Sequence, residues 1–177
     1  MLQKLALLML GGMLWIAATH TASATVALSV PNYPTVAQLE SGWNDAFVAV
    51  LTSVYGSTPT IITTTTYKGV GGEIYVVSKF TVGTINGSIL GLAFDPATAT
   101  SLGSGNYRYT ASAGFRCDPN GSCQSCSAVQ IIKQDGTKIQ RCDCNSAGGC
   151  DFYPVDGQFS GTYDINPSSY SGLPNMS

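Results

Sequence analysis

Apolar side chains recur at spacings of three and four along one early segment of the chain. They occupy Val36, Leu39, Trp43, Ala46, Phe47, Val50, Leu51 and Val54. This period predicts an amphipathic helix over about residues 36–55 that packs on a sheet with its aromatic residues buried. Thr35 and Gln38 form a capping box that predicts the start of the helix, and Gly56 predicts its end.

The next part of the chain changes to strand chemistry. It alternates apolar and polar positions and is rich in β-branched residues, with glycines between the segments. The pattern predicts an antiparallel meander with strands over 60–67, 73–82 and 87–94, the last of them preceded by a turn at Asn86-Gly87.

Three further segments are less regular. Residues 25–31 alternate apolar and polar positions, which predicts a short strand or an extended arm. A loop rich in small residues is expected over 95–105, followed by a strand over 107–115.

Together these elements predict an α+β fold. The helix packs on an antiparallel β-meander that is followed by a disulfide-stapled β-hairpin region, and a mostly-β sandwich is the alternative. One helix followed by a meander is similar to the cystatin-like arrangement, a likeness of architecture alone, because the residues carry no inhibitor motif. We expect residues 25–167 to form a single domain and residues 168–177, poor in aliphatic side chains, to form a loosely ordered tail.

The N-terminus has the pattern of a secretory signal peptide. A short segment with one positive charge precedes an apolar stretch over 5–18, and Ala22-Ser23-Ala24 offers small residues for cleavage. As a helix, that stretch would rise about 21 Å, which is short of the roughly 30 Å hydrocarbon core of a bilayer. We therefore expect cleavage of residues 1–24, secretion to the extracellular space or cell surface, and no membrane span.

Removal of that segment takes away the one histidine, His20. The remainder has seven Lys or Arg against ten Asp or Glu, and a net charge near −3 gives no electrostatic reason to bind nucleic acid. Without histidine there is no Ser-His-Asp or Cys-His pair. Glu40 falls on the exposed side of the predicted helix, and most aspartates occupy turn contexts. A non-enzymatic protein without a cofactor is expected.

All six cysteines lie in one window, at Cys117, Cys123, Cys126, Cys142, Cys144 and Cys150. In an exported chain this even count predicts three disulfides, which could connect in fifteen ways. A hairpin around Asp135-Gly136 narrows the choice. With a three-residue loop over 134–136, the numbers of opposing residues add up to 270, and Cys126 lies opposite Cys144. With a two-residue turn, they add up to 271 and the pairing shifts by one residue.

We favour a disulfide between Cys126 and Cys144 on this basis. Cys142 and Cys144 project from the same face of one strand, so a bond between them is disfavoured. Cys142 would then pair with Cys117 or Cys123, and Cys150 with the other.

The cysteine window also permits other chemistries. Cys123, Cys126, Cys142 and Cys144 have a spacing suited to zinc, although an oxidising compartment favours disulfides. Cys123 to Cys126 has the spacing of a redox motif, but it lies among turn residues rather than at a helix N-terminus. Calcium is a further alternative, because oxygen ligands gather here, and turn chemistry explains them equally well. These are Asp118, Asn120, Asp143, Asn145 and Asp151.

Charged residues are scarce, at 10% of the chain, and Thr, Ser, Gly, Asn and Tyr supply the polarity instead. We favour a secreted non-enzymatic structural or adhesive protein of the cell surface or extracellular matrix, self-assembling into a filament or other homo-oligomer through its terminal arms. The alternative is a monomeric secreted binding module, protease-inhibitor-like or carbohydrate-binding. It would bind an extracellular protein or glycan with its cysteine-stapled loops and the aromatic residues near them. Those aromatic residues are Phe115, Phe152, Tyr153, Phe159 and Tyr163.

Overall fold

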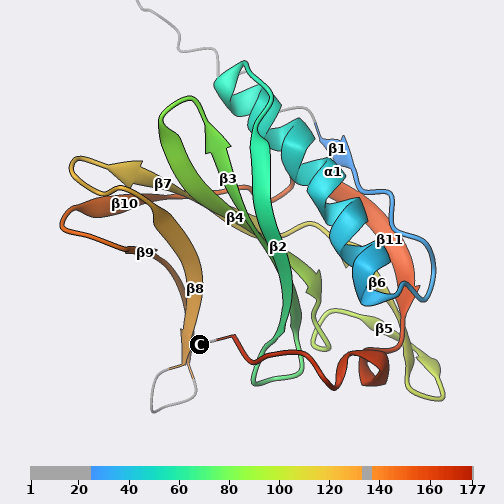
Figure 1. The fold of residues 1–177 in the computed structure, drawn as a ribbon. Helices are drawn as coiled ribbons and strands as arrows, with labels where there is room; N and C mark the ends of the chain where they lie inside the picture. Colours follow the sequence, from blue (N-terminus) through green and yellow to red (C-terminus); the bar gives the residue numbers. More distant parts are fainter. Residues whose placement is uncertain (1–24, 133–136, 177) are drawn as a thin grey trace, which may run out of the picture.

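The computed structural model describes residues 25–132 and 137–176, which form an α+β fold (Figure 1). The predicted signal peptide lies outside these residues. The elements are β1 (Val26–Ala27), α1 (Val36–Tyr55), β2 (Thr60–Lys68), β3 (Ile74–Val82), β4 (Ile85–Phe94), β5 (Thr100–Gly103), β6 (Asn106–Ala111), β7 (Gly114–Asn120), β8 (Cys126–Ile132), β9 (Lys138–Cys144), β10 (Gly149–Pro154), β11 (Phe159–Ile165) and the 3-10 helix η1 (Pro167–Tyr170). The strands form a five-stranded sheet (β10-β7-β4-β3-β2), a four-stranded sheet (β1-β11-β6-β5) and the hairpin β8-β9.

Helix α1 begins and ends as the sequence predicts. The Thr35 hydroxyl accepts a hydrogen bond from the Gln38 N–H, and the Gln38 side chain accepts one from the Thr35 N–H. Gly56 closes the helix in the left-handed conformation that glycine adopts without a steric penalty. One residue of the apolar stripe deviates, because Val54 in the last turn remains 40% exposed.

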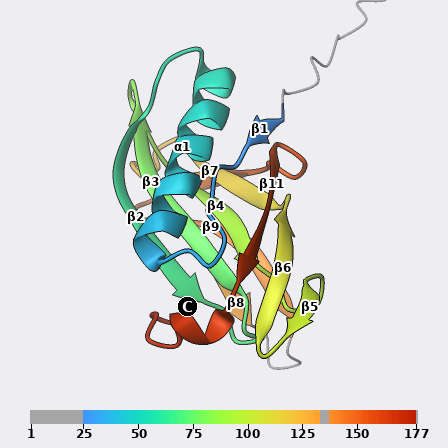
Figure 2. The same ribbon diagram turned by 90° about the vertical axis from the view of Figure 1, so that its right-hand side faces the viewer.

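One face of the five-stranded sheet is closed by α1 and the four-stranded sheet, and the main hydrophobic core lies between them (Figure 2). Trp43 and Phe47 are fully buried there, as predicted, and the Trp43 ring centroid lies 5.1 Å from that of Phe159 in β11. Gly91 in β4 provides the space for the indole, since a Cβ atom at this position would lie 2.0 Å from the Trp43 ring. The helix therefore packs closely on the sheet.

The hairpin β8-β9 covers the opposite face of the same sheet (Figure 1). Its paired positions sum to 270 throughout, from Cys126 opposite Cys144 to Ile132 opposite Lys138, which is the register expected for the three-residue loop. The conformation of the loop at 134–136 lies outside the described residues. The molecule is thus layered as helix, sheet and hairpin.

The meander is confirmed, but its second turn is not at Asn86-Gly87. Val82 pairs with Ile85, so the turn consists of Gly83-Thr84, with Gly83 at a φ of 57°. Gly87 lies within β4 instead, where a Cβ atom would come within 2.6 Å of the Phe80 ring. This glycine allows close packing rather than a turn.

Two segments after the meander also differ from the prediction. The expected loop over 95–105 contains the short strand β5. The expected strand over 107–115 is divided into β6 and β7, which belong to different sheets. Residues 112 and 113 separate the two strands, so the chain crosses between the sheets at this point.

Both terminal arms pack on the chain itself. Strand β1 runs parallel to β11 as the edge of the four-stranded sheet. The expectation of a loosely ordered tail is wrong for residues up to Met176. The buried Tyr170 donates its hydroxyl hydrogen to the Pro34 carbonyl over 2.5 Å, and the Met176 N–H donates to the Lys68 carbonyl at the edge of β2. An aromatic anchor and backbone hydrogen bonds thus hold a segment that is poor in aliphatic side chains.

Helix α1 also contacts the β2 edge through Glu40. Its carboxylate accepts hydrogen bonds from the backbone N–H and the hydroxyl of Thr66. Glu40 therefore does not lie on a free face of the helix, as the periodicity suggested, but satisfies a donor on a sheet edge. Among the described residues, no helix is long and apolar enough to cross a bilayer.

Candidate binding groove

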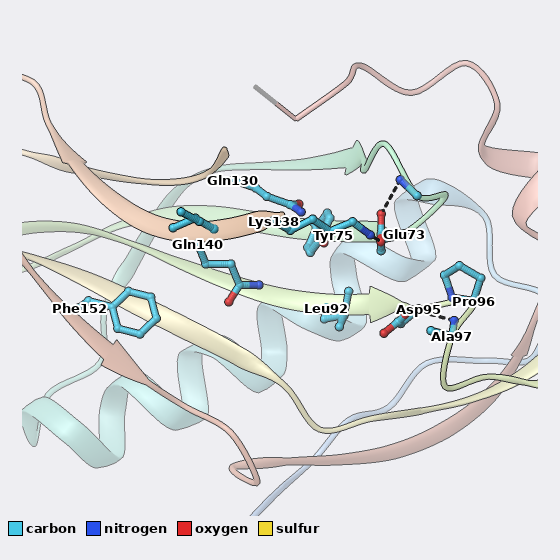
Figure 3. Close-up of a pocket in the computed structure, with 12 residues that line it drawn as sticks. Glu73, Tyr75, Leu92, Asp95, Pro96, Ala97, Gln130, Lys138, Gln140 and Phe152 are labelled. Carbon is cyan, nitrogen blue, oxygen red and sulfur yellow. Dashed lines mark hydrogen bonds and ion pairs between the residues drawn. The ribbon is translucent and has the colours of Figure 1, made fainter. Parts of the chain in front are cut away.

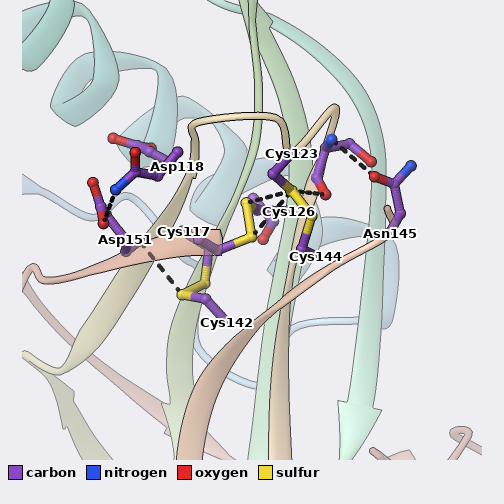
Figure 4. The surroundings of a disulfide bond; sticks show 12 residues. Cys117, Asp118, Cys123, Cys126, Cys142, Cys144, Asn145 and Asp151 are labelled. Carbon is purple, nitrogen blue, oxygen red and sulfur yellow. Dashed lines mark hydrogen bonds between the residues drawn. A yellow bond between two sulfur atoms is a disulfide. The ribbon is translucent and has the colours of Figure 1, made fainter. Parts of the chain in front are cut away.

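All six cysteines form disulfides, which cluster where β8 begins and β9 ends (Figure 4). The bonds are Cys117–Cys142, Cys123–Cys144 and Cys126–Cys150. They join β9 to β7, β9 to the β7–β8 loop, and β8 to β10. Three disulfides are consistent with an extracellular protein. They also occupy every sulfur atom that the zinc and redox hypotheses would need.

The favoured pairing of Cys126 with Cys144 is wrong, although the two residues do lie opposite each other. Both belong to the face of the hairpin that packs on the sheet. Cys150 on β10 and Cys123 in the preceding loop approach the same face, with the Cys123 sulfur 3.6 Å from that of Cys150 and 3.7 Å from that of Cys126. Packing between layers therefore selects the partners, and hairpin register alone could not reveal it.

The oxygen-bearing residues of the window have separate partners rather than a shared site. Each of them is engaged locally: Asp118 with Arg116 and the Tyr55 hydroxyl, Asn120 with Asp151, Asp143 with Arg141, and Asn145 with the Ser125 N–H. Among the described residues, the only set of closely grouped metal-ligating atoms is three cysteine sulfurs, all in disulfides. The structure thus gives no support to the calcium hypothesis.

A cavity of about 630 Å³ opens between the sheet and the loop end of the hairpin (Figure 3). We call it the hairpin groove. The hairpin contributes Gln130, Lys138, Ile139 and Gln140; the sheet and its turns contribute Gly71, Glu73, Tyr75, Leu92, Asp95, Pro96, Ala97 and Phe152. Its volume lies within the range of typical small-molecule sites, about 300–1,000 Å³.

Gln130 is the most unusual residue of the groove. Its side chain is only 3% exposed, and its Oε1 atom has no hydrogen-bond partner among the described residues. An unsatisfied buried polar atom costs about 1–3 kcal/mol and is rare in folded proteins. The Gln130 amide lies beside the Tyr75 hydroxyl, where their hydrogen bond lowers the Tyr75 pKa, but burial outweighs it and raises that pKa to about 12. Tyr75 therefore remains a neutral hydroxyl at physiological pH.

An ion pair connects the hairpin to the sheet at one side of the groove. The Lys138 ammonium group contacts the Glu73 carboxylate, which also accepts a hydrogen bond from the Gly71 N–H over 3.0 Å. The Glu73 side chain is 6% exposed. Its charge is therefore neutralised where it lies, and the pair holds the two walls of the groove together.

Phe152 forms the wall at the opposite end. Its ring stacks on that of Phe115, with centroids 4.7 Å apart, and remains 43% exposed. Of the five aromatic residues that the sequence suggested for binding, Phe152 lines the groove and Tyr153 is exposed on the same strand. Phe115, Phe159 and Tyr163 are buried.

No motif in the sequence marks the polar residues of the groove. Gln130 and Gln140 lie opposite each other in the hairpin, on the same face as Cys126, Cys142 and Cys144. The register of the three-residue loop, one of the two alternatives, implies this placement, so it could have shown two amides on the face of the hairpin that bears these cysteines. Comparison with protein-family models, curated proteins and solved structures finds no significant match.

Proposed function

We propose that the protein is an extracellular, non-enzymatic binding module that holds an uncharged saccharide in the hairpin groove. The proposal rests on the buried Gln130 carbonyl oxygen, which has no hydrogen-bond partner among the described residues. A ligand hydroxyl that donates to it would compensate for its desolvation, and such convergent polar groups in a largely preformed cavity are typical of ligand sites.

The remaining walls support a saccharide as the class of ligand. Sugars present hydroxyl groups at their edges and C–H groups on their faces. Gln130, Gln140 and the Tyr75 hydroxyl offer donors and acceptors for the edges, while Phe152 offers an exposed ring against which an apolar face can pack. Lys138 and Glu73 neutralise each other, which favours an uncharged ligand.

Binding without chemistry agrees with the residues present. A glycoside hydrolase needs one free carboxylic acid and one free carboxylate across the scissile bond. Glu73, one of the carboxyl groups in the groove, is engaged by Lys138 and the Gly71 N–H.

The test is a matched pair of glutamine variants of the disulfide-bonded protein. Gln130→Leu removes from the groove an oxygen that has no partner among the described residues, and Gln158→Leu removes a second such buried oxygen, which lies outside the groove. Calorimetric titration with cello-, chito- and malto-oligosaccharides of two to six units would measure binding. We expect both variants to stay within about 1 kcal/mol of wild-type stability in urea, because in Gln130→Leu the lost hydrogen bond to Tyr75 is offset by removal of the unsatisfied oxygen. Only Gln130→Leu should lose at least about tenfold in affinity, or about 1.4 kcal/mol.

The outcomes separate a ligand site from a structural glutamine. Absence of binding to every saccharide in wild type would overturn the proposal. It would also fail if Gln130→Leu binds as wild type does, or if the two variants lose affinity equally.

Self-assembly through the terminal arms remains a prediction without a contact to support it. Both arms pack on their own chain, β1 on β11 and the tail on β2. The β2 edge is further restricted by a bulge between Ile61 and Thr63, a feature that hinders pairing with a second sheet.

A further inference from the structure

We propose that the saccharide is a chain of several sugar units, which extends from the hairpin groove past Asp95 into a second cavity. The inference rests on the proposed saccharide binding and adds the length of the ligand and the residue at its centre. Asp95 and Leu92 line both cavities, so the two are contiguous.

The second cavity has a volume of about 500 Å³ and lies along β5, β6 and the residues that follow them. Hydroxyl side chains dominate its polar lining, from Thr98, Thr100, Thr110 and Ser112. Hydroxyl groups both donate and accept hydrogen bonds, as sugar hydroxyls do. In the hairpin groove the Gln130 and Gln140 amides likewise both donate and accept, so the two cavities offer different groups with the same hydrogen-bonding capacity.

Asp95 lies where the two cavities meet. Its Oδ1 atom accepts a hydrogen bond from the Ala97 N–H over 2.9 Å, which fixes the carboxylate at the start of the turn. Burial is the main cause of the raised pKa values of Tyr75, which lines the hairpin groove, and Tyr109, which lines the second cavity, and the Asp95 carboxylate raises both further. Tyr75 and Tyr109 thus each line one of the two cavities, and Asp95 lines both.

The charged residues that line the two cavities favour an uncharged saccharide. The Arg108 guanidinium is held by two hydrogen bonds to Asp164, of 2.8 and 3.1 Å, and Lys138 is held by Glu73. Asp95 forms no ion pair within the part of the chain that the structure describes. Its carboxylate can accept hydrogen bonds from sugar hydroxyls but repels uronic acids.

The experiment compares saccharide length in three proteins. Ser112→Tyr adds bulk at an exposed position in the second cavity, and Ser160→Tyr adds the same bulk at an exposed position on β11 that lines neither cavity. We expect wild type and Ser160→Tyr to bind the hexasaccharide at least about tenfold more tightly than the disaccharide of the preferred series. Ser112→Tyr should lose this gain and keep the affinity for the disaccharide.

Equal affinity for both lengths in wild type, or an unchanged gain in Ser112→Tyr, would overturn the extended site while leaving the hairpin groove as the site. Absence of all saccharide binding would overturn the proposed function itself. Asp95→Asn adds an independent readout. The ratio of affinities for neutral and oligogalacturonate chains should fall at least about tenfold, and an unchanged ratio would show that Asp95 does not exclude uronic acids.

Discussion

On one face of the five-stranded sheet, α1 packs on aromatic and aliphatic side chains, and the Trp43 indole lies against the Gly91 backbone. On the other face, the hairpin is joined to the sheet by disulfides at one end and by the Glu73–Lys138 ion pair at the other. Between those two attachments, the hairpin face changes from cysteine and alanine to glutamine, and the hairpin groove remains open there. Aromatic and aliphatic packing stabilises the first face, whereas disulfides and an ion pair hold the second around a groove that contains the Gln130 amide.

The largest effect should come from truncating an aromatic residue on the helix face. Phe47→Ala should lower the free energy of unfolding by about 3–5 kcal/mol, because it opens a cavity in a fully packed core. The matched variant Phe152→Ala, at a half-exposed ring on the hairpin face, should cost about 1–2 kcal/mol. Urea unfolding measures both. Equal losses in the free energy of unfolding would show that the helix face and the hairpin face contribute equally to stability, which would contradict this account.

Removing the Cys117–Cys142 bond should have the next largest effect. The double variant Cys117→Ala/Cys142→Ala should lose about 2–4 kcal/mol of stability. Trp43 is the only tryptophan in residues 25–177, so its fluorescence reports on the helix face alone. We expect its native emission to stay unchanged while the variant unfolds at lower urea. A red-shifted native emission would mean that the hairpin also supports the helix face.

Tyr75 should give the smallest effect, and only at alkaline pH. Burial raises its pKa in the folded protein to about 12, above the value of about 10 in an unfolded chain. The neutral phenol therefore contributes stability that is present below pH 10 and is lost as the pH rises from 10 to 12. Relative to wild type, Tyr75→Phe should retain about 1 kcal/mol more of its stability between pH 9 and pH 11. An identical pH dependence of urea unfolding in both proteins would contradict this account.

Much of the helix face could be predicted because its determinants are local. The capping box, the terminal glycine and the three-to-four spacing all act within one helical segment. The hairpin register could be narrowed to two alternatives that depend on loop length, and the structure has the one expected for a three-residue loop. The second turn was missed because Asn86-Gly87 is typical of hairpin turns, and the need for space beside Phe80 is not visible in the sequence.

The hairpin face depends on contacts between layers, which the sequence pattern does not contain. Cys126 could be placed opposite Cys144, but its partner depends on how β10 approaches the hairpin. The groove combines Tyr75 from β3 with Gln130 from β8, residues that no motif connects. Its position follows from the three-layer arrangement and became evident only with the fold.

Saccharide binding on the hairpin face can be tested most directly by amide and indole chemical-shift mapping of residues 25–177. The probes are neutral hexasaccharides of the glucose and N-acetylglucosamine series. The account predicts that perturbations concentrate at Gln130, Gln140, Leu92 and Asp95, and that the indole N–H of Trp43 does not shift. Perturbations centred on α1, or none at any residue of the groove, would contradict it.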